Sequence, residues 1–463
     1  MNNPNRNYDV IVVGAGAAGC LFSRNLAGAG YSVCLVEKRE RNKLSHDWWD
    51  AVEKSIFDKV SITYPKDDEL WKGGECIIYS PLNLLQVKLN PFPYHEQLDR
   101  RKFNLRLLTE AIDTGVDFFD KTTVKGPIID DESDTIVGIR IQDLDPISAK
   151  LVVDCSGFEG IIRSNIPFKT DFDKKIRRED TMITYREMRE KKPSVFYPGE
   201  IIITSKNKGI TAAYFNQDKY VEFFGAHADL SSIKVTPKEM AYELIEKYKD
   251  ICGKEILKGG YETPVPYRRA LDSFVANGLM IIGDAACQTN TRTGEGVASS
   301  LYAAMIASNA AIRAFENESI KKEDLWQYNV EYHRSKFNQV FSSSDITGKI
   351  LFTLSEEEVE YVLTNDIMDI RNYFKSVEDT EKLTVEIIKK EKYRPKISAR
   401  AKILAHLATL AELPSKEQEM QKLCREYPEE YNPDTFNSWR EKMNNCYIVR
   451  YDLDKQPESE LIV

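Results

Sequence analysis

The sequence predicts an α/β protein with three parts: a parallel sheet with flanking helices, an inserted antiparallel sheet, and a helical C-terminal cap. A strand, a glycine-rich turn, a helix and a second strand follow one another in residues 8–38. Between about residues 180 and 226 the hydrophobic period changes to two, which is typical of antiparallel strands with one buried face. After about residue 320 the chain is charged and helix-patterned.

The opening segment carries a dinucleotide-binding motif. An apolar strand leads into Gly14-Ala15-Gly16-Ala17-Ala18-Gly19, and the strand after the helix ends at Glu37-Lys38. Gly14 permits the tight turn, Gly16 lets a pyrophosphate approach the backbone, and Gly19 lets the helix pack closely on the strand. The free N–H groups at the helix start favour phosphate. Glu37 stands 18 residues after Gly19, close to the spacing of an acid that accepts hydrogen bonds from ribose. An ordinary glycine-rich turn is the alternative, and the register of strand, helix, strand and acid disfavours it.

Composition describes a soluble globular protein with core for two or three domains. The chain has 463 residues, 42% of them hydrophobic and 30% charged, and its net charge is −9. It contains no basic block, so we expect no nucleic-acid partner. No run approaches the roughly 18 apolar residues that span a bilayer. The polar N-terminus is not expected to be a signal peptide. Peripheral membrane contact remains compatible with this composition.

The cysteines and histidines indicate neither a disulfide framework nor a metal site. The eight cysteines form no CxxC pair, and the five histidines are isolated from one another in the sequence. We therefore expect no metal and a reducing, cytoplasmic location. The missing cysteine pair near the first helix also argues against a disulfide reductase.

The middle of the chain alternates between two kinds of structure. Residues 43–96 are irregular and aromatic-rich, and an amphipathic helix is predicted over 101–111. Residues 121–128 and 135–142 read as strands of a small β element, and a buried strand follows at 151–154. The inserted sheet is predicted from strands at 181–187, 200–204, 210–215 and 220–225, followed by a helix at 236–249.

A buried strand returns at residues 278–283, and a long Ala-rich helix is predicted over 294–314. The helices expected in the C-terminal cap are 322–341, 356–363, 380–391, 399–410, 415–426 and 434–444. These patterns predict a discontinuous cofactor domain (1–42, 97–165 and 260–320), a substrate domain (43–96 and 166–259) and a C-terminal helical domain (321–463).

Two further motifs at strand ends accompany the glycine-rich turn. Val153-Asp154-Cys155-Ser156-Gly157 closes one strand, and Ile282-Gly283-Asp284-Ala285-Ala286 closes another. Their order, with an antiparallel sheet between them, resembles the Rossmann-like FAD fold of the glutathione-reductase type. It resembles most closely the group of aromatic hydroxylases, halogenases and geranylgeranyl reductases. The resemblance implies FAD as cofactor and assigns Asp284 to the flavin ribityl chain.

The same resemblance assigns a cofactor contact to Arg100, in Arg100-Arg-Lys-Phe103-Asn104-Leu-Arg-Leu107, although a solvated charge on the helix face is an equal alternative. Thr293-Gly294-Glu295-Gly296-Val297 opens the long helix, whose N–H groups favour the negative charge of reduced flavin and would raise its reduction potential. Close packing of helix on strand is the other reason for these glycines. The predicted cofactor-binding residues are Gly14, Ala15, Gly16, Ala18, Gly19, Glu37, Lys38, Arg100, Val124, Asp154, Gly157, Gly283, Asp284, Gly294, Gly296 and Val297.

Further motifs resemble archaeal geranylgeranyl reductases, from the first strand to about residue 445. They are Asp50-Ala-Val-x-Lys-x-x-Phe-Asp-Lys, Ile78-Tyr-Ser-Pro, Tyr185-Arg-Glu, Val265-Pro-Tyr-Arg-Arg, Gly294-Glu295-Gly296 and Ser438-Trp-Arg. This resemblance implies hydride delivery from reduced FAD to the alkene carbons of an isoprenoid lipid. Such a reaction needs a long apolar pocket, which the second sheet and the helical cap would supply.

The chain departs from that family where substrate or the flavin ring is expected. Trp48-Trp49-Asp50 replaces a segment with Cys before Gly-Asp, and an aromatic motif ending in Phe-Pro is replaced around Tyr214-Phe215. Thr291 replaces a Pro. We therefore take Trp48, Trp49, Tyr214, Phe215 and Thr291 as substrate-pocket candidates, with buried core as the alternative for the two tryptophans. Cys287 is interpreted as a plain buried thiol rather than a group near the flavin.

Three functions remain open at this stage. The leading one is an FAD-dependent reductase of polyprenyl or similar apolar double bonds. The alternatives are a flavin monooxygenase of the same fold and a non-catalytic flavin-binding protein. The sequence names no catalytic residue. It contains a single dinucleotide motif, so the electron donor could be transiently bound NAD(P)H, ferredoxin or another carrier. The expected location is the cytoplasm, with contact to the membrane surface left open.

Overall fold

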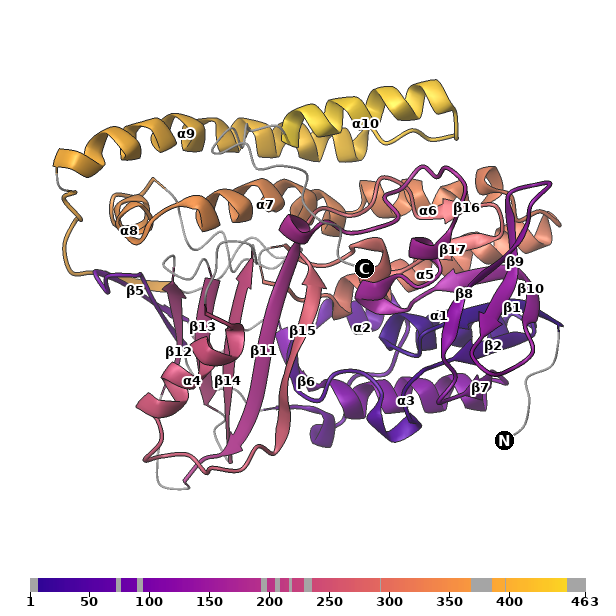
Figure 1. Cartoon of the computed structure of the whole chain (residues 1–463), viewed down its shortest axis with the longest axis horizontal. Helices are drawn as coiled ribbons and strands as arrows, with labels where there is room; N and C mark the ends of the chain where they lie inside the picture. Colours follow the sequence, from indigo (N-terminus) through magenta and orange to yellow (C-terminus); the bar gives the residue numbers. More distant parts are fainter. Residues whose placement is uncertain are drawn as a thin grey trace.

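A computed structural model shows how the chain is arranged (Figure 1). It describes residues 7–71, 76–89, 95–192, 198–204, 209–215, 219–228, 235–291, 293–367, 385–395 and 397–447. These residues form two eight-stranded sheets that lie side by side, one two-stranded sheet, and helices that pack against them. The predicted fold class, a parallel-sheet domain with an inserted antiparallel sheet and C-terminal helices, is confirmed.

The first sheet is mainly parallel, in the order β16-β17-β10-β1-β2-β7. Strands β2 and β17 and the last four residues of β1 and β10 are buried, as expected for parallel strands covered on both faces. A hairpin of β8 and β9 extends the sheet beside β10. The bounds are β1 Asn7–Val13, β2 Val33–Val36, β7 Asp117–Phe119, β8 Val124–Asp130, β9 Thr135–Ile141, β10 Ile147–Asp154, β16 Val275–Ala276 and β17 Leu279–Ile281.

Three helices cover this sheet side by side: α1 (Ala17–Gly28) packs between α3 (Arg100–Asp113) and α5 (Val297–Glu316). Asp99 caps α3, because its carboxylate accepts a hydrogen bond from the Lys102 N–H at 3.2 Å. The α5 face is lined by small buried residues such as Ala304, Ala307 and Ala311, which let the helices approach one another closely.

The second sheet has the order β15-β11-β14-β13-β12-β4-β5-β18, and every pair is antiparallel except β12 with β4. α4 (Pro237–Lys247) covers one of its faces. The bounds are β4 Cys76–Tyr79, β5 Leu85–Leu89, β11 Thr181–Glu190, β12 Gly199–Thr204, β13 Gly209–Phe215, β14 Tyr220–Ala228, β15 Lys258–Pro266 and β18 Val385–Lys389. β15 crosses the predicted boundary at residues 259/260, and the domain boundaries stay a prediction.

Shorter elements join the two large sheets. β3 (Trp49–Glu53) pairs with β6 (His95–Asp99), and α2 (Ser55–Lys59) follows β3. Thus 43–96, expected to be irregular, contains β3, β4 and β5. Short 3₁₀ turns lie at Arg41–Lys43, Asp67–Glu69, Gly157–Glu159, Arg163–Asn165, Arg178–Asp180 and Gly283–Ala286. Among the helices that the structure describes, none is both long and apolar enough to cross a membrane.

The C-terminal helices are α6 (Lys322–Arg334), α7 (Lys336–Thr353), α8 (Glu356–Thr364), α9 (Ile397–Arg425) and α10 (Pro433–Tyr447). α9 and α10 run across the top of Figure 1, above α7.

Three expectations for this part of the chain were wrong. The helix expected over 322–341 breaks at Ser335, which is extended at ψ 154°. The two helices expected over 399–426 form one helix that runs through Pro414. The described part of the helix expected over 380–391 holds strand β18, because its backbone pairs with β5; residues 380–384 lie outside the described residues.

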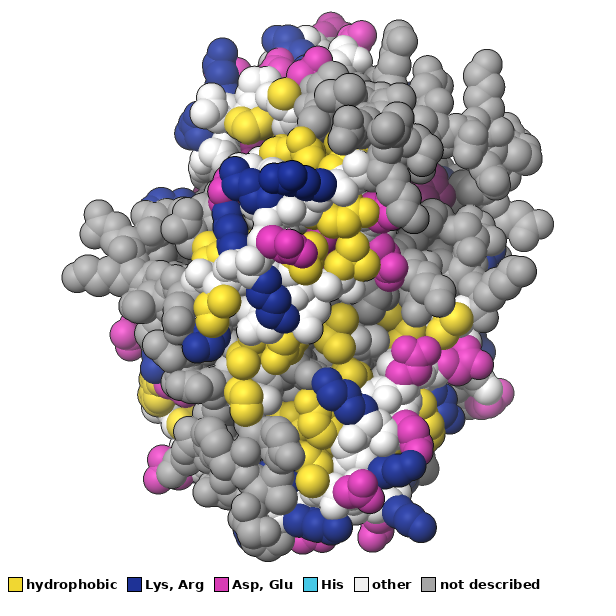
Figure 2. Space-filling view, turned by 90° about the vertical axis from the view of Figure 1, so that its left-hand side faces the viewer, with side chains coloured by type: hydrophobic (Ala, Val, Ile, Leu, Met, Phe, Trp, Pro, Cys, Tyr) yellow, Lys and Arg dark blue, Asp and Glu magenta, His cyan; other side chains and the backbone are white. Residues whose placement is uncertain are grey.

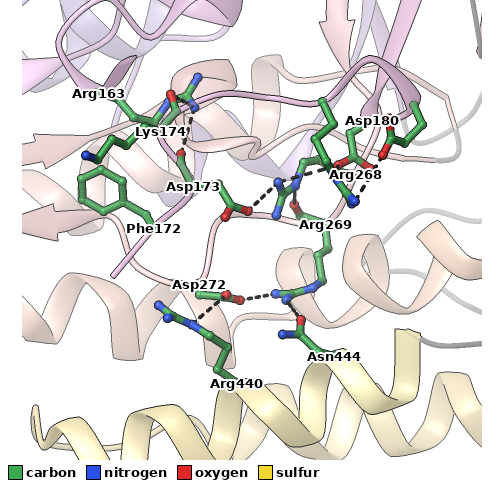
Figure 3. A network of polar contacts seen from close by, with 12 residues as sticks. Arg163, Phe172, Asp173, Lys174, Asp180, Arg268, Arg269, Asp272, Arg440 and Asn444 are labelled. Carbon is green, nitrogen blue, oxygen red and sulfur yellow. Dashed lines mark hydrogen bonds and ion pairs between the residues drawn. The ribbon is translucent and has the colours of Figure 1, made fainter. Parts of the chain in front are cut away.

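A network of charged side chains fastens α10 to the loop that follows β15 (Figure 3). Arg269 and Arg440 both pair with the carboxylate of Asp272, and the Arg440 Nε lies 3.1 Å from Asp272 Oδ2. Arg269 also donates to the side-chain oxygen of Asn444 at 2.9 Å. Beside them, Arg268 pairs with Asp173 at 2.8 Å. The structure thereby brings together two motifs that lie far apart in the sequence, Val265-Pro-Tyr-Arg-Arg and Ser438-Trp-Arg.

We expect D272A to loosen the C-terminal helices. The substitution leaves two mostly buried guanidinium groups without their shared carboxylate, which costs about 3 kcal/mol of unfolding free energy. Urea unfolding measures this loss, and hydrogen exchange is expected to rise first in α10. E441A, which changes an exposed acid on the same helix, is the control. Equal stability of D272A and wild type would contradict the proposed role of this network.

Candidate functional site

A cavity of about 690 Å³ lies where the carboxyl ends of β1, β2 and β17 face the second sheet. Most of the predicted site residues line it, although they come from widely separated parts of the sequence. They are Gly14, Gly16, Ala18, Gly19, Glu37, Lys38, Trp48, Trp49, Arg100, Val124, Gly157, Tyr214, Gly283, Asp284, Gly294, Gly296 and Val297. Four predicted residues, Ala15, Asp154, Phe215 and Thr291, are not part of this lining.

The turn after β1 depends on two glycines that touch the backbone. Gly14 has φ +104°, and a Cβ there would lie 2.3 Å from the carbonyl oxygen of Cys155 at the end of β10. A Cβ on Gly19 would lie 2.0 Å from the Gly14 carbonyl oxygen. Both side chains must therefore be absent for the protein itself to fold.

Gly16 is different, because a Cβ there would meet nothing within 4 Å. It stands at the N-cap of α1 with ordinary φ −71°, and no side chain within the described ranges caps that helix. The protein fold alone does not require glycine here. The open space and the uncapped N–H groups face the cavity, which is the arrangement that a phosphate-bearing ligand needs.

Glu37 closes the turn from the next strand. Its Oε2 accepts a hydrogen bond from the Ala15 N–H at 3.0 Å, and its Oε1 accepts one from the Arg39 N–H at 2.9 Å. This explains why Ala15 lies behind the cavity surface while Glu37 lines it. Lys38 pairs with Glu159 at 2.7 Å near the rim, where both side chains are exposed.

Asp154 shapes the neighbouring loop instead of lining the cavity. Its buried carboxylate accepts hydrogen bonds from the Ile162 and Arg163 N–H groups at 2.9 and 2.8 Å, and from the Ser156 hydroxyl at 2.6 Å. Because these bonds hold the loop after β10, Asp154 positions Gly157. Gly157 lines the cavity at φ +76°, with no atom within 4 Å of a Cβ built there.

Asp284 lies in the 3₁₀ turn after β17, below the start of α5. Its Oδ1 accepts a hydrogen bond from the Thr289 hydroxyl at 2.8 Å, and burial raises the pKa of its carboxyl. A Cβ on Gly296 would lie 3.2 Å from the same oxygen, so Gly296 keeps it accessible. Gly294, at φ +76°, again has open space beside it, and Val297 is the first residue of α5.

A chain of alternating charges crosses the cavity from α3 to the second sheet. Arg100 Nη1 lies 3.0 Å from Asp50 Oδ2, and Arg186 Nη1 lies 3.5 Å from Asp50 Oδ1. Arg186 Nε lies 3.1 Å from Glu222 Oε1. Arg100 is therefore paired inside the site rather than solvated on a helix face. Burial raises the pKa of Glu222 to about 7 against the opposing effect of Arg186.

Glu295 stands between Gly294 and Gly296 and also lines the cavity. Burial and the nearby Asp50 carboxylate raise the pKa of Glu295 to about 8, against a lowering hydrogen bond from Thr293. A carboxyl group with such a pKa is mostly protonated at neutral pH.

Aromatic side chains form one wall. Trp48 stacks on His46 with ring centres 4.3 Å apart, and Trp49 stacks on Trp71 at 5.8 Å. Arg186 lies over the Trp48 ring at 5.6 Å. Trp48 and Trp49 are both buried and both line the cavity. The two interpretations of these residues, pocket wall and buried core, are therefore compatible.

Two substrate-pocket candidates lie elsewhere. Phe215 packs with Phe223 and Tyr248 below α4, on the opposite face of the second sheet from the cavity. The reason is strand alternation, which turns Tyr214 into the cavity and Phe215 away from it. Thr291 is fully buried, and its hydroxyl donates a hydrogen bond to the Phe341 carbonyl at 2.7 Å. Cys287 is a buried thiol, and burial raises its pKa to about 11.

An apolar arm of the cavity extends between the second sheet and helices α7 and α8. We define this arm by its lining residues: Ile78, Ile201, Ile210, Phe337, Phe341, Val359 and Leu363. The sequence predicted an apolar pocket built from the second sheet and the cap, and such a surface is present there.

Sequence reasoning missed Arg186, Glu222, Glu295 and Asp50 as charged groups of the site. One signal was available: Arg186 and Glu222 occupy strands whose neighbouring positions are apolar, where an unpaired charge would be costly. For the described residues, no cluster of His, Cys, Asp or Glu is suited to hold a metal ion.

Comparison with known proteins finds a similar reductase along nearly the whole chain. It is 27% identical over 450 residues to a digeranylgeranylglycerophospholipid reductase of Sulfolobus acidocaldarius, covering 95% of this chain and 97% of that one. Residues 9–172 match the family model described as lycopene cyclase protein.

Two solved structures share the fold. A geranylgeranyl bacteriochlorophyll reductase-like protein from Thermoplasma acidophilum aligns with TM-score 0.69 and 18% identity, over 90% of this chain and 99% of that one. A flavin-dependent brominase aligns with TM-score 0.58 and 16% identity, over 82% and 96% of the two chains. The resemblance inferred from the motifs is confirmed.

We expect the two helix-start glycines to respond differently to alanine. G19A forces a Cβ against the Gly14 carbonyl and is expected to lose about 1–3 kcal/mol of unfolding free energy. G16A has room and an ordinary φ, so its stability is expected to stay within about 0.5 kcal/mol of wild type. Urea unfolding of both variants measures the difference, and equal losses would show that Gly16 also serves the fold.

Proposed function

The chain is homologous over 95% of its length to a digeranylgeranylglycerophospholipid reductase, and we propose that it is an FAD-dependent reductase of polyprenyl double bonds. The observation that carries this proposal is the set of residues that lines the cavity. One end is lined by the glycines of a dinucleotide turn, and the other end is the apolar arm. A cofactor and a long apolar chain could therefore meet in one enclosed space.

The residues at the first end fit FAD. Gly16, Gly157 and Gly294 leave open space that no protein atom fills, and the start of α1 offers N–H groups to a pyrophosphate. Glu37 supplies a carboxylate for ribose hydroxyls, and Asp284 supplies a half-buried acceptor for the ribityl chain. The start of α5 favours negative charge on a bound ring system.

When bound, FAD supplies hydride chemistry, and the residues of this chain arrange the surroundings. Arg100 and Arg186 hold positive charge beside Asp50, and Arg186 also lies over the Trp48 ring. The apolar arm holds an isoprenoid chain and excludes water, which favours hydride transfer over side reactions. The Trp48 and Trp49 rings offer flat surfaces against which a ring or an alkene can pack.

A flavin monooxygenase of the same fold is the second candidate, since the flavin-dependent brominase has this architecture too. Sequence similarity to the Sulfolobus acidocaldarius reductase extends over 95% of this chain, which supports the reductase. A non-catalytic flavin-binding protein is the third candidate. The charged side chains that line the cavity favour an active site over this candidate.

The decisive experiment follows reoxidation of the reduced flavin without oxygen. We expect the purified protein to bind FAD, and reduced protein to be reoxidised by a geranylgeranylated glycerophospholipid but not by its saturated counterpart. G16A is expected to bind FAD at least about tenfold more weakly, because its methyl group fills the phosphate side of the cavity. Failure of every polyprenyl lipid to oxidise the flavin would contradict the proposal. Substrate-coupled oxygen consumption without peroxide release would support the monooxygenase.

I210W tests the apolar arm in the same assay. The larger side chain narrows the arm, so lipid-dependent reoxidation should slow at a given lipid concentration while FAD binding stays unchanged. I210V keeps the apolar surface and is the matched control. Equal behaviour of I210W and wild type would show that the lipid binds elsewhere.

The electron donor stays open among NAD(P)H, ferredoxin and other carriers. Membrane contact is supported by exposed apolar side chains on the face that carries β5 and α8, where Figure 2 shows them among charged side chains of both signs. Leu82 and Ile367 are 39% and 40% exposed and flank α8, which also lines the apolar arm. We propose a cytoplasmic protein that takes its lipid from a membrane surface at this face.

A double change, L82E with I367E, is expected to weaken binding to phosphatidylcholine vesicles by about tenfold, since two apolar side chains no longer enter the lipid. Cosedimentation measures the bound fraction. Y242E changes a similarly exposed side chain on α4 and is the control. A larger loss in Y242E than in the double variant would move the contact to the α4 side.

A further inference from the structure

Glu295 differs from the other carboxyl groups around it. Asp50 lies within ion-pair distance of Arg100 and Arg186, and Glu222 within ion-pair distance of Arg186. No Lys, Arg or His of the described part of the chain forms an ion pair with Glu295. Its charged form is therefore the least compensated of the three, and the neutral carboxylic acid is favoured.

Glu295 also occupies the junction between the two ends of the cavity. Its neighbours Gly294 and Gly296 lie on the cofactor side, next to Asp284. Across the cavity it interacts electrostatically with Arg186 of β11 and Tyr214 of β13, which belong to the sheet that also carries the apolar arm. A proton held by Glu295 is thus placed between the proposed cofactor end and the proposed lipid end.

The groups that face Glu295 come from several elements. Asp50 and Glu53 of β3 raise its pKa after burial, while Thr293 and Arg186 lower it, with a net value of about 8. The start of α5 stabilises the carboxylate that remains after a proton has left. The group is therefore a neutral acid at pH 7 that can release its proton at modest cost.

We propose that Glu295 is the proton donor in double-bond reduction, an inference that rests on the proposed function. One alkene carbon accepts the hydride, with its electron pair, from the reduced cofactor. The other alkene carbon forms a C–H bond to the Glu295 proton with the former π electrons. Glu295 becomes a carboxylate and regains a proton from water, so that each turnover consumes one hydride and one proton.

Other cavity groups suit this role less well. Burial, helped by Arg100, lowers the pKa of His46 well below its usual value, so the ring is neutral and holds no proton to spare. Burial raises the pKa of Tyr214, which makes it a weak acid. Burial raises the pKa of Glu222 to about 7 against the opposing effect of Arg186, 3.1 Å away, so a larger share of Glu222 than of Glu295 is a carboxylate at neutral pH.

The test compares wild type with E295Q, which keeps the size of the side chain and removes the acid. We expect E295Q to bind FAD and to be reduced by dithionite like wild type, but to be reoxidised by lipid at least about 100-fold more slowly. Wild-type reoxidation should fall as the pH rises through about 8, where Glu295 loses its proton, whereas the residual E295Q rate should show no such fall. E316Q makes the same change at the exposed far end of α5 and serves as the control.

Infrared spectroscopy supplies a readout that does not depend on turnover. Wild-type protein at pH 7 should show a protonated carboxyl stretch that titrates near pH 8 and is missing in E295Q. If E295Q does not fold, the titration of the carboxyl stretch in wild type tests the assignment. Absence of that titration would overturn Glu295 as the proton donor. If wild type reduces lipid and E295Q does so equally fast with the same pH profile, the assignment fails while the proposed function stands. If wild type reduces no polyprenyl lipid, the proposed function itself fails.

Discussion

The structure depends on the close approach of two strand ends that only a glycine allows. β1 and β10 run parallel, and the Gly14 backbone stands against the Cys155 carbonyl so closely that no Cβ fits between them. This contact sets the direction of α1 and leaves its first N–H groups facing outward into the cavity. β17 ends beside β10 and brings Asp284 to the same edge. Segments from residues 14, 155 and 284 therefore share one site because the carboxyl ends of parallel strands meet at one edge.

One end of the cavity is lined by the glycine turn and the other by the apolar arm. The charged side chains that also line the cavity must balance one another's charge. Water cannot screen these groups well, so each carboxylate needs a partner or a proton. Arg100 and Arg186 partner Asp50 and Glu222, whereas burial favours the protonated form of Glu295. The number of protonated carboxyl groups in the site thus depends on the two cations supplied, Arg186 from the second sheet and Arg100 from α3.

Sequence-based prediction worked best at positions where the local backbone or the ligand chemistry allows only one residue type. The glycine turn and Glu37 were predicted because strand, turn and spacing each demand a particular residue type, whereas Asp284 was assigned by the family resemblance; Gly14, Gly16, Gly19, Glu37 and Asp284 all line the cavity. Phe215 was misplaced because a motif does not tell which face of a strand a side chain takes. Asp154 stands at a strand end like Asp284. The sequence does not show that the carboxylate of Asp154 accepts hydrogen bonds from the backbone N–H groups of the following loop. The helix expected over 380–391 failed because pairing with β5, a long-range contact, overrides local propensity.

That pairing has a consequence for how the chain folds. β5 and β18 are neighbours in the sheet but about 300 residues apart in the sequence. The edge of β5 stays open until nearly the whole polypeptide has been synthesised, since its partner strand leaves the ribosome late. Closing so long a loop is slow, and an open strand edge invites pairing with other chains. The nascent protein therefore passes through a period in which the sheet that borders the apolar arm has an unpaired edge, and a shortened chain that ends before β18 would keep that edge permanently.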